Sequence, residues 1–69
     1  MTKAILPLAA MEKLLKKAGA PRVSADAKEA LREVLEEEAE KIGDKAARLA
    51  KHSGRKTVKK ADVKEAARA

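Results

Sequence analysis

The residue with the widest chemical range in this 69-residue sequence is His52, which is its only histidine. A histidine titrates near neutral pH and can act as a general acid, a general base or a metal ligand. Each of these roles needs a second group, and the chain has no cysteine and no nucleophile or further ligand at a suitable spacing. The sequence therefore predicts no enzyme, no metal, no cofactor and no small-molecule substrate.

Lysine and arginine side chains offer a different chemistry, which is the binding of anions. They number 17 against 11 aspartates and glutamates, and the net charge of +6 in so small a chain indicates a polyanionic partner. Sites for single-stranded nucleic acid usually stack bases on aromatic rings, but this chain has no Phe, Tyr or Trp. A duplex contacted along its phosphates needs no such rings. The alternative is the charged Lys/Glu surface of a hyperthermophilic or engineered protein.

Helix-forming residues, interrupted by prolines and glycines, predict an all-α chain with a short, a long and a short helix. Pro7 suits a first helical turn and Gly19 a position just after a helix end. Pro21 disfavours helix in the residue before it, and Ser24 is a good N-cap. The expected elements are a helix from Pro7 to Gly19, a connector at 20–23, a helix from Ala25 to about His52, a connector at 55–58 and a helix from Lys59 or Lys60 to the end.

The chain length predicts one domain, residues 1–69, with little stability of its own. A domain of this size buries only about 60% of the surface that its unfolded chain exposes. Because disulfides and metal clusters are excluded, a partner chain is the expected source of further buried area. The sequence has no transmembrane run, and the segment before Pro7 is too short for a secretory signal. We therefore expect a soluble, cytoplasmic protein.

The predicted long helix would be about 28 residues and about 42 Å long, at 1.5 Å per residue. A chain of this size cannot cover such a helix from both sides, so its apolar stripe should face another molecule. Glu38 interrupts this stripe, either at its margin or as an interior charge, and Gly43 lies in mid-helix. The acidic run at Glu36–Glu38 and Glu40 predicts a solvated face away from any DNA. The expected dimer core consists of Leu31, Val34, Leu35, Ile42 and Leu49.

Three stretches of the sequence resemble archaeal histones. They are Leu6-Pro7 before the first helix, Lys16–Ser24 around the first connector and Leu49–Val58 around the second. The similarity covers nearly the whole chain, and the two connector motifs at this separation form a specific joint signal. The resemblance implies a histone fold in which two subunits interlock head to tail in a handshake, with each first connector beside the partner's second.

The same resemblance implies roles for particular residues. Arg22 would insert into a minor groove that faces the protein. Lys13, Lys16, Lys56 and Thr57 would hold phosphates, and Ser24 and Arg55 would complete the DNA-binding set. Arg55 and Asp62 match a structural ion pair. The positions where family members join dimer to dimer are Leu49, His52, Asp62 and Glu65.

The implied function is sequence-nonspecific binding, bending and compaction of double-stranded DNA by a homodimer, associated with the chromosome or nucleoid. Larger oligomers would form on DNA, but Glu65 departs from the apolar residue that polymerising members tend to carry. Two alternatives stay open. One is a histone-fold interaction module that pairs with a different chain and binds DNA weakly, and the other is an engineered assembly module. His52 itself fits either an exposed helix end or a dimer–dimer contact.

Overall fold

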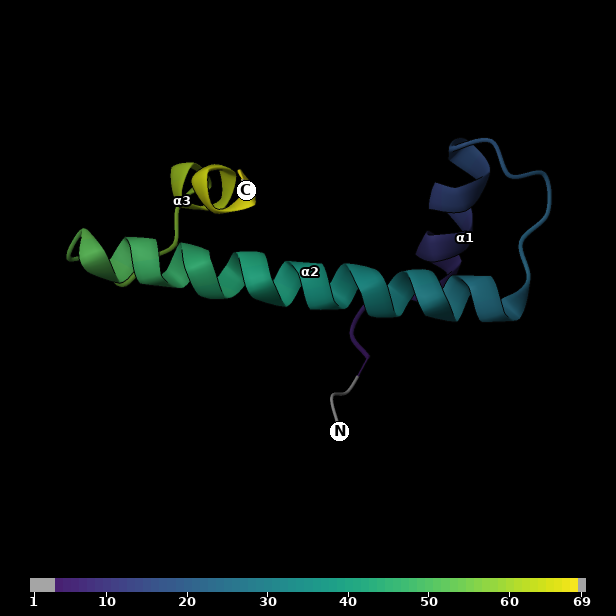
Figure 1. The fold of residues 1–69 in the computed structure, drawn as a ribbon, viewed down its shortest axis with the longest axis horizontal. Coiled ribbons are helices and arrows are strands. Elements are labelled where there is room, and N and C mark those ends of the chain that lie inside the picture. Colours follow the sequence, from purple (N-terminus) through teal and green to yellow (C-terminus); the bar gives the residue numbers. More distant parts are fainter. Residues whose placement is uncertain (1–3, 69) are drawn as a thin grey trace. The chain divides into compact units, whose positions relative to one another are not determined.

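The computed structural model describes residues 4–68, and three helices account for its regular structure. They are α1 (Leu8–Lys17), α2 (Ala25–His52) and α3 (Lys60–Ala67), in that order along the chain (Figure 1). No strand occurs within the described residues. The predicted all-α, short–long–short pattern is thus confirmed. No helix of the described part has both the length and the apolar character needed to cross a membrane.

Proline and glycine lie at the ends of α1, which is shorter than the predicted Pro7 to Gly19: it starts one residue later and its last residue is Lys17. Pro7 is the N-cap, with an extended backbone (φ −75°, ψ 141°), and the first helical residue is Leu8. At the other end, the Gly19 N–H donates to the Lys16 carbonyl at 3.0 Å and the Ala20 N–H to the Leu15 carbonyl at 3.0 Å. Gly19 has φ +118°, a conformation that side chains with a Cβ rarely adopt.

The long helix α2 begins at the predicted cap. The Ser24 hydroxyl accepts a hydrogen bond from the Ala27 N–H at 3.1 Å, and Asp26 places negative charge in the first turn. Gly54, with φ +74°, ends the helix, and the Arg55 N–H donates to the Ala50 carbonyl at 2.9 Å. These bonds satisfy main-chain groups that a helix end leaves without intrahelical partners.

The last helix starts where the sequence indicates but stops earlier. Lys59 is the N-cap of α3, and its N–H donates to the Asp62 carboxylate at 2.8 Å. The sequence predicts a helix to the end of the chain, but Arg68 is already extended (ψ 112°). Residue 69 lies outside the described residues.

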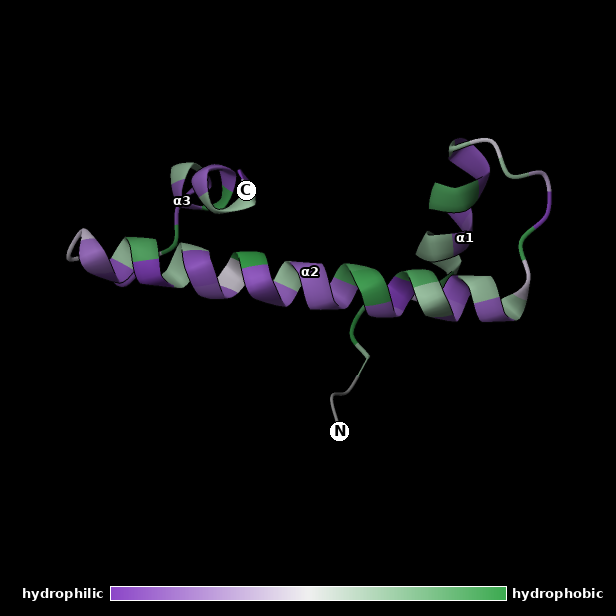
Figure 2. Cartoon of the chain, in the orientation of Figure 1, coloured by the Kyte–Doolittle hydropathy of each residue, from purple (hydrophilic) through white to green (hydrophobic). Residues whose placement is uncertain are grey.

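The chain divides into two units, Met1–Glu37 and Glu38–Ala69, and each is described by itself. In the first unit Met11 is the buried apolar residue, whereas in the second Ala46, Ala50 and Ala66 are buried. Apolar and polar residues alternate along α2 (Figure 2). Within residues 4–68 no Leu, Ile or Val side chain is buried, so each unit has only a small core.

Candidate nucleic-acid interface

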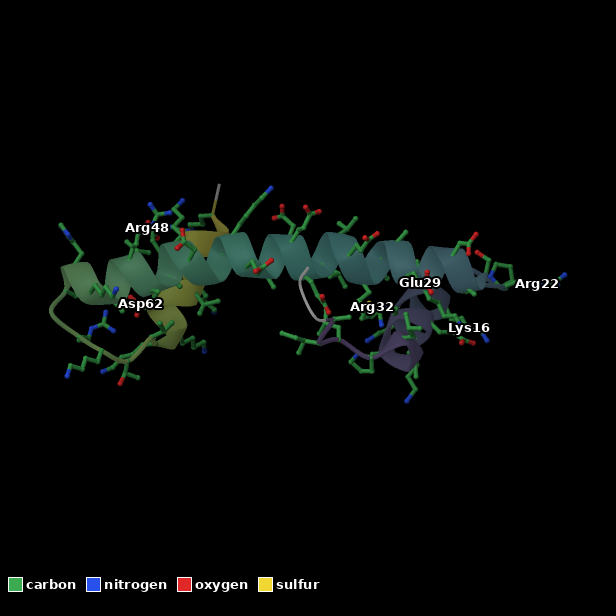
Figure 3. All side chains as sticks on the ribbon, turned by 90° about the horizontal axis from the view of Figure 1, so that it is seen from below. Lys16, Arg22, Glu29, Arg32, Arg48 and Asp62 are labelled. Carbon is green, nitrogen blue, oxygen red and sulfur yellow. The ribbon has the colours of Figure 1, made fainter. Side chains whose placement is uncertain are left out.

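The first connector presents Arg22 to solvent. Arg22 is exposed and lies beyond the first residues of α2 (Figure 3). Within residues 4–68 none of the ion pairs includes it. It borders a shallow, mainly apolar groove whose other lining residues are Leu15, Ala20, Val23, Ser24 and Ala27. A connector beside a capped helix start thus carries a guanidinium that is available to an anion.

The two lysines predicted to hold phosphates on α1 differ in their surroundings. Lys13 is exposed and belongs to none of the ion pairs of the described residues. The Lys16 ammonium lies 3.1 Å from the Glu12 carboxylate, and Lys28 of α2 lies 3.3 Å from the same group. Hydrogen bonds from Lys16 and then Lys28 lower the pKa of Glu12 below its ordinary value. Part of the Lys16 charge is therefore balanced within the chain.

The second connector is held by a two-bond ion pair between Arg55 and Asp62. The Arg55 Nη1 donates to Asp62 Oδ2 at 2.9 Å, and Nη2 donates to Oδ1 at 3.0 Å. Nη1 also donates to the Thr57 carbonyl at 3.1 Å, which links the guanidinium to the middle of the connector. Parallel bonds of this kind fix geometry as well as adding stability. Lys56 and Thr57 are exposed on the connector thus held.

The charges of this pair are strongly coupled. Arg55 hydrogen bonds, followed by the Lys59 N–H, lower the pKa of Asp62 from 3.8 to about 2. The Asp62 carboxylate in turn raises the pKa of Arg55. Because Asp62 is buried and both its oxygens accept hydrogen bonds, its position favours a structural role. These bonds occupy donors of Arg55, so its guanidinium is less available to a phosphate than that of Arg22.

The acidic run at Glu36–Glu38 and Glu40 was expected to lie on a solvated face, and for Glu36 this expectation was wrong. One of its oxygens, Oε2, accepts hydrogen bonds from the Ile5 and Leu6 N–H groups, both at 2.7 Å. The side chain is half-buried, and the bonds from Leu6 and then Ile5 lower its pKa. Glu37, Glu38 and Glu40 are exposed as expected. Glu36 fixes the segment before α1, a role that the helical pattern alone did not signal.

The residues predicted to join dimers lie on the second unit. Lys45, Arg48, Leu49 and His52 line a shallow groove on α2. The Arg48 guanidinium lies 2.7 Å from the Asp44 carboxylate. Glu65 on α3 is exposed, and its carboxylate lies 3.8 Å from Arg68. Among residues 4–68 no group of three or more His, Asp or Glu side chains is placed to hold a metal ion.

The sequence that forms this arrangement is similar to known proteins over nearly its whole length. Residues 4–67 match the family model described as histone-like transcription factor (CBF/NF-Y) and archaeal histone. The chain is 55% identical over 64 residues to one of the subunits of archaeal histone HAN1 of Thermococcus zilligii, covering 93% of this chain and 96% of that protein. It is 54% identical over 63 residues to probable archaeal histone 3 of Methanocaldococcus jannaschii, covering 91% and 94%.

Proposed function

The chain belongs to the family of histone-like transcription factors and archaeal histones, and on that premise we propose that two copies pair and together bind, bend and compact double-stranded DNA. The observation that carries the proposal is the exposure of Arg22 and Lys56, each on a connector next to a helix end. Neither side chain is in an ion pair within the described residues. Cations in such places can approach phosphates without first breaking an internal bond.

Contacts to the DNA backbone would supply the affinity. Lys13 and Lys56 act as phosphate contacts, Thr57 adds a hydroxyl donor, and Lys16 contributes more weakly because of Glu12. Arg22 enters an inward-facing minor groove, where narrow, bent DNA has an enhanced negative potential. Ser24 and Arg55 act indirectly, Ser24 by capping α2 and Arg55 by holding the second connector. None of these groups is arranged to distinguish base pairs, so the binding is independent of base sequence.

Pairing of two copies is supported by the apolar surface that a single chain leaves open. Val34 on α2 is 55% exposed and Leu14 on α1 is 49% exposed. The expected core residues Leu31, Leu35, Ile42 and Leu49 are only half-buried. Burial of a large aliphatic side chain contributes about 1.5–3 kcal/mol, so a second copy covering these residues would supply much of the stability. The protein would then act on the chromosome as a dimer.

A salt titration tests the proposal. We expect log K for a short duplex to fall linearly with log salt, with a slope of about 0.9 for each phosphate neutralised. Two duplexes of unrelated sequence and similar flexibility should give the same slope and nearly the same affinity. The protein's mass in solution, measured without DNA, should be that of a dimer.

An affinity that hardly changes with salt would contradict phosphate-based binding. A preference of several kcal/mol for one duplex would contradict the absence of base recognition. A folded monomer that still binds DNA would refute the pairing while leaving the DNA contact intact.

A further inference from the structure

Glu38 is a charged residue at an apolar position of α2. Its neighbours at helical spacing on the same stripe are Leu35, Ile42 and Leu49, all half-buried, whereas Glu38 itself is exposed. Its side chain is 60% accessible, and the nearest cation is Lys41, whose ammonium lies 3.9 Å away at the limit of an ion pair. So long and exposed a pair contributes little stability. Within the part of the chain that the structure describes, the charge of Glu38 is therefore only weakly compensated.

The proposed pairing covers this stripe and therefore also covers Glu38. A carboxylate moved into an interface loses hydration, and this cost is recovered only if an opposite charge or a donor meets it there. In a symmetric pair the same patch lies on both subunits. The centre of α2, residues 25–52, falls next to Glu38. If the α2 helices of the two copies meet at their centres, the two Glu38 carboxylates come close together.

We infer that Glu38 determines partner choice: it weakens the pairing of identical copies and favours a second histone-fold chain that has Lys or Arg where this chain has Glu38. The inference rests on the proposed pairing and refines it. Charge complementarity identifies the favoured occupant of the α2 stripe, because a cation there would satisfy a carboxylate that, among the described residues, meets only the long, exposed ion pair with Lys41. Self-pairs form, but they are the weaker association.

A charge exchange at this position is the test. The full-length chain and its Glu38→Lys variant, one of them labelled with heavy nitrogen, are mixed, allowed to exchange subunits and weighed by native mass spectrometry. We expect more mixed pairs than random exchange of subunits would give, with an association constant for the mixed pair about tenfold or more above that of the unaltered self-pair. In addition, Glu38→Gln should self-associate several-fold more tightly than the unaltered chain, because it removes the repulsion without adding a charge.

Glu40→Lys is the matched control. It makes the same charge change on an exposed residue that lies about 200° around the helix from Glu38, at about 100° per residue. The inference is overturned if the unaltered chain and Glu38→Lys form mixed pairs only in the statistical proportion. It is also overturned if mixed pairs with Glu40→Lys are enriched to the same extent. Either outcome leaves the self-pairs and their DNA binding unaffected. The absence of any pair, mixed or identical, overturns this inference together with the pairing proposed above.

Discussion

Arg22 and Arg55, one on each connector, differ in what their guanidinium groups contact. Arg55 donates three hydrogen bonds within its own unit, two of them to Asp62. Arg22 lines an open groove and is exposed. A guanidinium whose donors are occupied by a carboxylate positions the chain around it, whereas an unoccupied one is available to a ligand. Residue type alone does not separate these two roles, since both residues are basic; the resemblance to archaeal histones did, by matching Arg55 and Asp62 to a structural ion pair.

Replacement of Arg22 tests its proposed role in DNA binding. We expect Arg22→Ala to weaken binding to unrelated duplexes by similar factors and to reduce the salt slope by about 1, because one phosphate-region contact is lost. The matched control is Arg48→Ala, which removes the same charge from a residue paired with Asp44. Fluorescence anisotropy over a range of salt concentrations measures both effects. If both variants lose the same DNA affinity, Arg22 contributes only through the net charge of the protein.

Protonation of Asp62 at low pH should break its ion pair with Arg55 and release the second connector. The pKa of Asp62 is about 2 in the folded chain and 3.8 in its ordinary state, so the folded form binds its proton less readily. The stabilisation is complete above the ordinary value and is lost as the pH falls from about 4 towards about 2. Asp62→Asn should lower Tm by several degrees near neutral pH and flatten the dependence of Tm on pH in this acidic window. Thermal unfolding followed by circular dichroism measures both, and an unchanged acid profile would refute the role of this pair.

At the scale of elements, most helix ends were predictable to within one or two residues because local chemistry sets them. Ser24, Gly19 and Gly54 act on the backbone within a few residues of themselves, and the structure confirms each of these helix ends. Glu36 was not predictable in this way. Its partners Ile5 and Leu6 lie 31 and 30 residues away, and no periodic pattern records which distant N–H groups a carboxylate meets. The same holds for Glu12 and Lys28, which are 16 residues apart.

The attachment of the segment before α1 to Glu36 can be measured directly. Glu36→Gln removes the charge that strengthens both hydrogen bonds, so the Ile5 and Leu6 amides should exchange with solvent about tenfold faster or more. The exposed neighbour Glu37→Gln is the control and should leave both amides unchanged. Since these bonds lower the pKa of Glu36, the unaltered chain should lose the same protection as the pH falls through the acidic range. Amide exchange by NMR would contradict this assignment if both variants behaved alike.

At the scale of the whole molecule, the buried apolar residues between positions 4 and 68 are Met11 and three alanines, which is little core to sustain a single chain. If pairing supplies the missing burial, folding and association are coupled, and Tm should rise by several degrees when protein concentration is raised a hundredfold. Val34→Ser, placed on the exposed part of α2, should lower Tm and steepen its concentration dependence. Scanning calorimetry at several concentrations measures this. A Tm independent of concentration would mean that a single chain is stable by itself.

Assembly of several dimers along DNA depends on what α3 presents to a neighbour. Glu65 is 63% exposed, and its only ion pair among residues 4–68 is with Arg68 at 3.8 Å, so it would bring negative charge into any contact made with Leu49 and His52. Desolvating such a carboxylate is costly. We therefore expect the unaltered chain to protect a fixed length of DNA from nuclease as protein is added, and Glu65→Leu to give lengths that grow by one dimer footprint at a time. Glu40→Leu, which removes a charge from an exposed residue of α2, should behave like the unaltered chain. Growing lengths with the unaltered chain would mean that a neighbouring cation satisfies Glu65, and that charge at this position does not limit assembly.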